Sequence, residues 1–165
     1  MSTMRRRPYV TTRTHEVFAI AHDVADQLGH EDVTPLHICI GLIREGRSIA
    51  AQIVQVRGAR LDVLLDELEA HLPPIGVPRV PVREHAWTLS DESILEHATR
   101  EGRELGAEFV GCEHVLLAFL RDPATVSAQL LAQHGVRFED VRTEVLRAYN
   151  ARPDGWTSPG SSPAV

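Results

Sequence analysis

The chain of 165 residues carries a formal net charge of −6, and 43% of its residues are hydrophobic. That length fits one compact domain or two small ones, and the composition is ordinary for a globular protein. The acidic balance disfavours nucleic acid as a partner, no apolar run approaches the roughly 20 residues that a membrane span needs, and the basic N-terminus lacks the apolar region of a secretory signal. We therefore expect a cytoplasmic monomer that binds neither nucleic acid nor membranes, with 1–10 as a flexible end.

An internal repeat with an offset of 77 positions organises the rest of the sequence. "LGHEDVTPLH" at 28–37 is matched by "LGAEFVGCEH" at 105–114, and matches run without a gap when 11–71 is laid on 88–148. Chance does not hold one register over such a length. Because a sequence repeat indicates a repeated structural unit, we expect two similar units, 11–71 and 88–149, within one domain.

The first unit has the sequence pattern of four helices. Gly29 supplies a stop for the first helix, and Thr34 with Pro35 has the residue types of an N-cap and a first helical position. The following "HICIGLI" is apolar on all sides, so this second helix is expected to be buried. Apolar residues at helical spacing mark the first, third and fourth helices: Val17, Ala21, Val24 and Leu28; Ile49, Ile53 and Val56; and Leu61, Leu64, Leu65, Leu68 and Leu72.

The second unit repeats this plan after a connector, 72–87, whose prolines favour an extended chain. Gly106 ends its first helix, "HVLLAFL" at 114–120 is its buried helix, and Asp122-Pro123 is interpreted as the start of its third. Its first and fourth helices are marked by apolar or small residues: Ile94, Ala98, Gly102 and Leu105, and Phe138, Val141 and Val145. No alternating strand pattern occurs. The prediction is an all-α protein with eight helices, two four-helix units related by a pseudo-two-fold axis, and a disordered tail at 150–165.

The repeated phrases "LGHEDVTPLHICIGLIREG" and "LGAEFVGCEHVLLAFLRDP" resemble the Clp repeat of the Clp/Hsp100 unfoldases. The family phrase is Leu-Gly-His, then Gly-Thr-Glu-His, an apolar helix and Arg-Glu-Gly. The tandem arrangement over 11–148 looks like the N-terminal domain of ClpC and ClpA, which precedes two AAA+ ATPase modules. This sequence has no G-x-x-x-x-G-K-[ST] phosphate loop and no lysine at all. The resemblance therefore implies a stand-alone N-terminal domain that binds no nucleotide and uses no cofactor.

The family's N-terminal domain is a docking platform for adaptor proteins and substrates, and in ClpC relatives its Gly-Thr-Glu-His helix start is a phosphoarginine pocket. Backbone N–H groups at a helix N-terminus attract phosphate, and the glutamate can accept hydrogen bonds from the guanidinium. The first unit has Leu36 where the glutamate stands, and Pro35 removes an N–H donor. The resemblance therefore places a pocket in the second unit alone, at Gly111, Cys112, Glu113 and His114.

A second candidate site lies at the junction that opens each unit. Trp87 and Thr88 stand where Val10 and Thr11 stand in the first unit, and Tyr9 adds an aromatic ring beside Val10. In the family this junction meets peptides and cyclic-peptide antibiotics. The resemblance therefore makes Tyr9, Val10, Trp87 and Thr88 candidate contacts, although aromatic residues at such a junction also serve as packing.

Several of these residues have structural interpretations beside the functional ones. Glu113 can be an acid that stabilises its helix dipole, and the matching His37 and His114 are expected to make structural hydrogen bonds rather than bind metal, since no second ligand recurs near either. Cys39, on a buried helix, is expected to be inert, whereas the dipole can lower the thiol pKa of Cys112.

No catalytic pair or nucleophile arrangement can be argued from the spacing of residues, so we expect no enzyme. The leading hypothesis is a binding module of the Clp protease system that acts as an adaptor, as a decoy, or as a sink for antibiotics directed at ClpC. The alternative is a regulatory helical protein unrelated to proteolysis, such as a transcriptional accessory.

Overall fold

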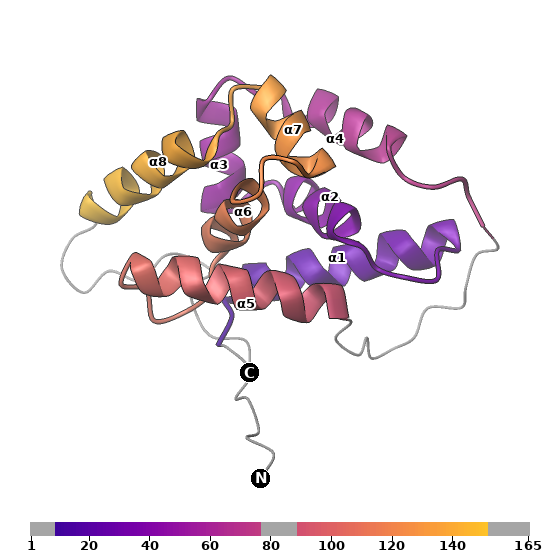
Figure 1. Cartoon of the computed structure of the whole chain (residues 1–165), viewed down its shortest axis with the longest axis horizontal. Helices are drawn as coiled ribbons and strands as arrows, with labels where there is room; N and C mark the ends of the chain where they lie inside the picture. The colour runs from indigo at the N-terminus through magenta and orange to yellow at the C-terminus, as the bar shows by residue number, and fades with distance from the viewer. Residues whose placement is uncertain (1–8, 77–88, 152–165) are drawn as a thin grey trace, which may run out of the picture.

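The computed structural model describes residues 9–76 and 89–151, leaving aside the side chains of 89 and 90. Most of the basic end, the later part of the connector and most of the tail at 150–165 lie outside these ranges. Within them the chain forms eight helices (Figure 1): α1 Thr12–Leu28, α2 Pro35–Glu45, α3 Ile49–Val56, α4 Leu61–Ala70, α5 Leu89–Glu104, α6 Cys112–Leu120, α7 Val126–Gln133 and α8 Phe138–Asn150. The all-α fold predicted from the sequence is confirmed. None of the described helices is both long and apolar enough to cross a membrane.

The expected helix stops are present at equivalent positions of the two units. Gly29 follows α1 with a φ of 66°, and Gly106 lies just beyond α5 with a φ of 74°. Glycine adopts this left-handed backbone without the steric cost that a side chain brings, so each stop fixes where the chain turns toward the next helix. At the other end of α1, the Thr11 hydroxyl accepts a hydrogen bond from the backbone N–H of Thr14.

Helices α2 and α6 lie against each other at the centre, and the other helices surround them (Figure 1). Packing across the two units is reciprocal: α3 contacts α8 while α4 contacts α7, and α1 contacts α6 while α2 contacts α5. This exchange follows the predicted pseudo-two-fold relation. The two units are therefore interleaved around a shared core rather than set side by side as separate bundles.

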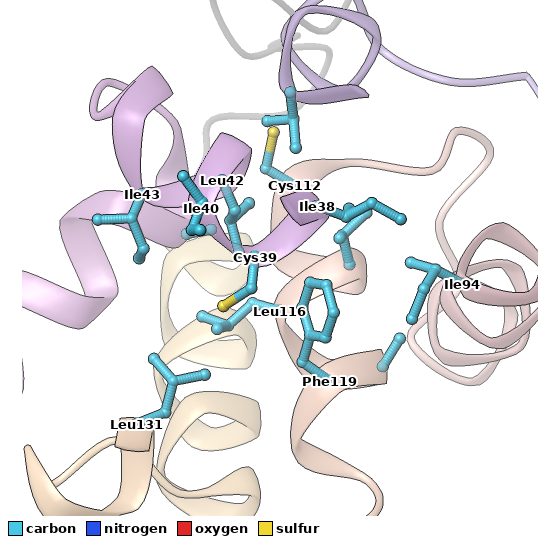
Figure 2. Packing of buried hydrophobic residues seen from close by; sticks show 14 of the residues in the cluster. Ile38, Cys39, Ile40, Leu42, Ile43, Ile94, Cys112, Leu116, Phe119 and Leu131 are labelled. Carbon is cyan, nitrogen blue, oxygen red and sulfur yellow. The ribbon is translucent and has the colours of Figure 1, made fainter. Parts of the chain in front are cut away.

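The core is one cluster of hydrophobic side chains that draws on both units (Figure 2). Ile38 and Leu42 of α2 and Leu116 of α6 are fully buried, and every residue of α6 is buried, as its apolar sequence predicts. Gly41 marks a close approach of α1 and α2, because a Cβ there would clash with the backbone oxygen of Val17. Tight burial of this kind positions the first turns of α2 and α6.

The start of α7 differs from the sequence-based prediction. Asp122-Pro123 lies in the preceding loop, and α7 begins at Val126 with Thr125 as its N-cap. The Thr125 hydroxyl accepts from the N–H of Ala128 at 3.2 Å, whereas the Asp122 carboxylate accepts from the N–H of Ala124 at 3.0 Å and so closes a turn. The equivalent N-cap of α3 is Ser48. Thr125 stands at the same place in the repeat, and comparing the two hydroxyl residues would have predicted the correct start of α7.

Candidate binding site at the start of α6

His37 and His114 stand at equivalent positions in the first turns of α2 and α6, and each is almost fully buried. The Nδ1 atom of His37 accepts from the backbone N–H of Thr34 at 3.0 Å, and Nδ1 of His114 accepts from the N–H of Gly111 at 2.9 Å. Each ring therefore satisfies a donor that the helix leaves without a partner. The structural role predicted for both histidines is confirmed.

In the second unit, a chain of hydrogen bonds runs from this histidine to Glu113. Because Nδ1 of His114 is an acceptor, Nε2 carries the proton and donates to the hydroxyl oxygen of Tyr149 at 2.8 Å. The Tyr149 hydroxyl in turn donates to Oε1 of Glu113 at 2.7 Å. Tyr149 comes from the last turns of α8, so packing of α8 against α6 delivers this hydroxyl to the helix start.

All four residues of the predicted pocket lie together and all four are buried: Gly111, Cys112, Glu113 and His114. The Glu113 carboxylate folds back over Gly111, where an added Cβ would clash with both carboxylate oxygens. Glycine is therefore required at that position as long as the carboxylate stays there. In this arrangement Glu113 is 8% exposed and the Tyr149 hydroxyl occupies its Oε1 atom, so a ligand that takes both carboxylate oxygens competes with Tyr149.

In the first unit, the equivalent histidine, His37, makes its second side-chain contact with a different partner. Nε2 of His37 lies 2.8 Å from Nδ1 of His30, and Nε2 of His30 lies 3.2 Å from the carbonyl oxygen of Pro73. Burial, and next His30, lower the pKa of His37 from 6.5 to about 4, so the ring is neutral at ordinary pH. Leu36 packs partly buried against the core. This helix start presents no carboxylate to a ligand.

Tyr9 and Val10, the described half of the second candidate site, lie beside the first candidate site. Val10 forms a parallel bridge with Val110, in which the N–H of Thr11 donates to the Val110 carbonyl and the N–H of Val110 donates to the Tyr9 carbonyl. Val10 is buried, whereas Tyr9 is 63% exposed and meets the ring of Phe109 edge to face. The structure thus brings Tyr9 and Val10 next to the residue that precedes Gly111. Trp87 and Thr88 lie outside the described residues.

The expectation of a lowered thiol pKa at Cys112 is wrong. Burial raises the pKa of Cys112 to about 12, and this effect outweighs the hydrogen bond with Thr14, which lowers it. Its sulfur lies 3.6 Å from the Thr14 hydroxyl oxygen, facing α1. Cys39 is likewise fully buried with a pKa raised to about 12, consistent with the inert role expected for it.

Two residues of these networks, Tyr149 and His30, were absent from the sequence-based prediction. The offset of 77 aligns Tyr149 with Leu72 and His30 with Ala107, so neither recurs in the other unit. A polar residue that the repeat fails to reproduce, at a position where its counterpart is apolar, was the available signal. Both residues contact the helix-start histidines, and these contacts differ between the two units.

Comparison with known proteins agrees with this fold. A family model described as the Clp repeat (R) N-terminal domain matches residues 9–134 and 87–163. The chain is 34% identical over 137 residues to the chaperone protein ClpB of Oceanobacillus iheyensis, and 32% identical over 152 residues to the negative regulator of genetic competence ClpC/MecB of Bacillus subtilis. These matches cover 83% and 92% of this chain, but the chain spans only 17% and 18% of those relatives' length.

Solved structures of similar fold include N-terminal domains of an Hsp104 protein and of two Clp proteins. The Hsp104 domain of Candida albicans matches with a TM-score of 0.65 over 87% of this chain and 93% of its own, at 17% identity. The domain of the ClpV1 ATPase from E. coli EAEC matches with a TM-score of 0.68 over 88% of each chain, at 17% identity. The ClpD domain of Arabidopsis thaliana matches with a TM-score of 0.60 over 92% of this chain and 100% of its own, at 16% identity. With the family match over most of its length and its interleaved eight-helix fold, this chain belongs to the Clp N-terminal domain family of the Clp/Hsp100 proteins.

Proposed function

We propose that this chain is a non-catalytic module that binds segments of other proteins within a Clp protease-chaperone system. The proposed site is the surface where Tyr9 and Val10 meet the loop before α6. Membership of the family supports the proposal. So does a fold match, with a TM-score of 0.66 and 17% identity, to a structure described as a peptide from the EAEC T6SS Sci1 SciI protein.

The observation that carries the proposal is an exposed aromatic ring held on a rigid backbone. Tyr9 has most of its side chain in solvent, yet hydrogen bonds on either side of Val10 tie its main chain to Val110. A large ring that loses little conformational entropy on binding is a favourable contact for a peptide. Such a ring beside the start of α6 suits an extended segment lying across the junction.

For the adjoining helix start we propose a narrower ligand class, a guanidinium phosphate such as phosphoarginine, bound in the second unit only. Glu113 would take the guanidinium, and the first turn of α6 would attract the phosphate. The Tyr149 hydroxyl makes the hydrogen bond to Glu113 that such a ligand needs. A guanidinium that takes both carboxylate oxygens therefore displaces the Tyr149 hydroxyl, which lowers the affinity relative to an open pocket.

Three roles fit such a module: adaptor, decoy, or sink for cyclic-peptide antibiotics directed at ClpC. We would titrate the protein into a degradation assay driven by the Bacillus subtilis ClpC, with and without a ClpC-directed cyclic peptide. An adaptor raises the rate, a decoy lowers it, and a sink restores the rate that the cyclic peptide has altered. A rate unchanged in every arm would contradict the proposal. Repeating the titration with Tyr9→Ser tests the site, because only the exposed ring is removed.

A further inference from the structure

A groove in the second unit lies between the end of α6, one face of α7 and the start of α8. We call it the α7 groove. It has a volume of about 680 Å³, within the roughly 300–1,000 Å³ of typical ligand sites. Ala128 and Ala132 lie one helical turn apart on α7, and their short side chains leave space for the groove. Leu120, Val136 and Phe138 complete its apolar lining.

Arg121 builds one wall of the α7 groove. Its Nε atom donates to Glu101 at 2.7 Å, a terminal nitrogen lies 3.4 Å from Glu104, and the guanidinium carbon lies 4.3 Å from the centroid of the Phe138 ring. Two carboxylates therefore already balance this charge. Arg121 orients Phe138 and is not the group that an incoming ligand would use.

Arg137 provides the available positive charge of the α7 groove. It is exposed at the N-cap of α8, and it makes no ion pair or side-chain hydrogen bond with any residue in the described ranges. A cation at a helix N-terminus gains nothing from the helix dipole. The acids nearby are Glu139 and Asp140 in the first turn of α8, and Asp140 lies 3.3 Å from Arg57. The position of Arg137 is explained better by a ligand than by the stability of α8.

Arg60, the equivalent arginine of the first unit, forms an ion pair, unlike Arg137. Arg60 is the N-cap of α4, and its guanidinium donates to the Asp62 carboxylate at 2.7 Å. Position 139 holds Glu where position 62 holds Asp, and no such bond forms in the second unit. The two equivalent arginines can therefore be compared directly: Arg60 pairs with Asp62 at the start of its own helix, whereas Arg137 lines the α7 groove.

We propose that the α7 groove is a second docking surface, which takes an extended segment of another protein with an apolar side chain beside an aspartate or glutamate. The apolar side chain fills the space above the alanines, and the carboxylate pairs with Arg137. Gln133 is exposed on the rim, and its side-chain amide, which makes no hydrogen bond in the described part of the chain, offers a donor and an acceptor to the segment's backbone. This surface shares no residue with the site around Tyr9 and Glu113.

A phage-displayed library of random linear peptides tests the proposal. The wild-type protein would be panned, and the enriched peptides would be synthesised with a fluorescent label and measured by anisotropy. We expect enriched peptides with a hydrophobic residue next to an acidic one, whose affinity weakens as salt concentration rises. Arg137→Glu should lower their affinity by about tenfold or more, the loss of one charge-assisted hydrogen bond. Ala132→Arg, which fills the groove, should abolish binding.

Arg60→Glu is the matched control, because it makes the same change at the same helix position of the first unit. It should leave affinity unchanged, as should Tyr9→Ser and Glu113→Gln, which belong to the separate proposed site. Far-ultraviolet circular dichroism would confirm that each variant is folded. Failure to enrich any peptide, or enriched peptides that bind Arg137→Glu as well as wild type, would overturn the proposal. Peptides sensitive only to Tyr9→Ser would overturn it while supporting the first site.

Discussion

Each buried histidine at a helix start tolerates only one arrangement of protons. In the first unit His37 accepts from Thr34 and faces His30, whose own Nε2 faces a carbonyl oxygen that can only accept. In the second, His114 accepts from Gly111 and passes its proton toward Tyr149. Adding a proton at Nδ1 of either ring breaks the bond that caps its helix. The neutral form of these residues therefore supports the fold.

The pKa of His37, lowered to about 4, predicts how stability changes with pH. The unfolded chain protonates this residue near pH 6.5, and the folded chain does so only near pH 4. Its contribution is therefore complete above pH 6.5 and is lost as the pH falls toward 4. We expect the free energy of unfolding to fall by about 2–3 kcal/mol from this residue between neutral pH and about pH 4.5. Urea unfolding at a series of pH values measures it.

His37→Gln is the comparison for that experiment, because glutamine does not titrate. The variant should be less stable than wild type at neutral pH, yet its free energy of unfolding should depend less on pH over the acid range. Identical pH profiles for the two proteins would show that another group carries the acid sensitivity.

The sequence could predict the histidines but not what they bind. His37 and His114 repeat at the same offset, so a shared structural role followed from position alone. Tyr149 reaches His114 from 35 positions away, through packing of α8 that no local pattern encodes. Since the repeat has Leu72 at the equivalent position, the sequence marked Tyr149 as a polar departure from the repeat but did not identify His114 as its partner.

At the scale of the element, helix ends depend on short-range hydrogen bonds that several residue types can make. Asp122-Pro123 resembled a helix start, but the Asp122 carboxylate closes a turn, and α7 begins at Val126 with Thr125 as its N-cap. In contrast, α2 does begin at Pro35 after Thr34, as predicted. Residue types alone could not separate these cases; comparing Thr125 with Ser48 across the repeat could have done so.

Removing the N-cap of α7 tests this correction. Thr125→Ala should lower the free energy of unfolding by about 1 kcal/mol, because the N–H of Ala128 loses its acceptor. Ser48→Ala should cost a similar amount at α3, and Pro123→Ala should change little, since it precedes the helix. Chemical denaturation of the three variants decides the matter. A larger loss for Pro123→Ala than for Thr125→Ala would restore the earlier start.

Gly41 tests the close approach of α1 and α2. In a helix interior, alanine is ordinarily about 1 kcal/mol more favourable than glycine. Here we expect the opposite sign, because the added methyl group meets the Val17 carbonyl and forces the two helices apart. Gly41→Ala should therefore lower the free energy of unfolding by at least about 1–3 kcal/mol, read from denaturant melts. A stabilised Gly41→Ala variant would contradict the packing described.

For the whole molecule, the repeat predicted two similar units, but it could not show that they exchange partners. α3 and α4 of the first unit pack against α8 and α7 of the second, and one apolar cluster spans both. A pattern of apolar residues identifies a buried face without naming the helix that covers it. The packing of each unit's helices against those of the other unit could therefore be seen only in the structure.

Interleaving makes neither unit independent. A fragment of residues 9–76 would expose the surfaces of α2, α3 and α4 that the second unit covers. We expect it to show weak helicity and a broad thermal transition by circular dichroism, whereas 9–151 should unfold in one cooperative step. Native-like helicity and a sharp transition in the isolated fragment would mean that each unit holds its own core.

The central proposal is that the start of α6, and not that of α2, is the charged ligand site, and that the Tyr149 hydroxyl competes with the ligand for Glu113. Calorimetric titration of phosphoarginine into wild type, Glu113→Gln, Tyr149→Phe and Leu36→Ala tests this directly. We predict saturable binding to wild type, affinity at least about tenfold weaker for Glu113→Gln, tighter binding for Tyr149→Phe and no change for Leu36→Ala. No binding to wild type or Tyr149→Phe at millimolar ligand would contradict the claim. A loss for Leu36→Ala as large as that for Glu113→Gln would contradict it as well, and would favour a ligand site nearer Tyr9.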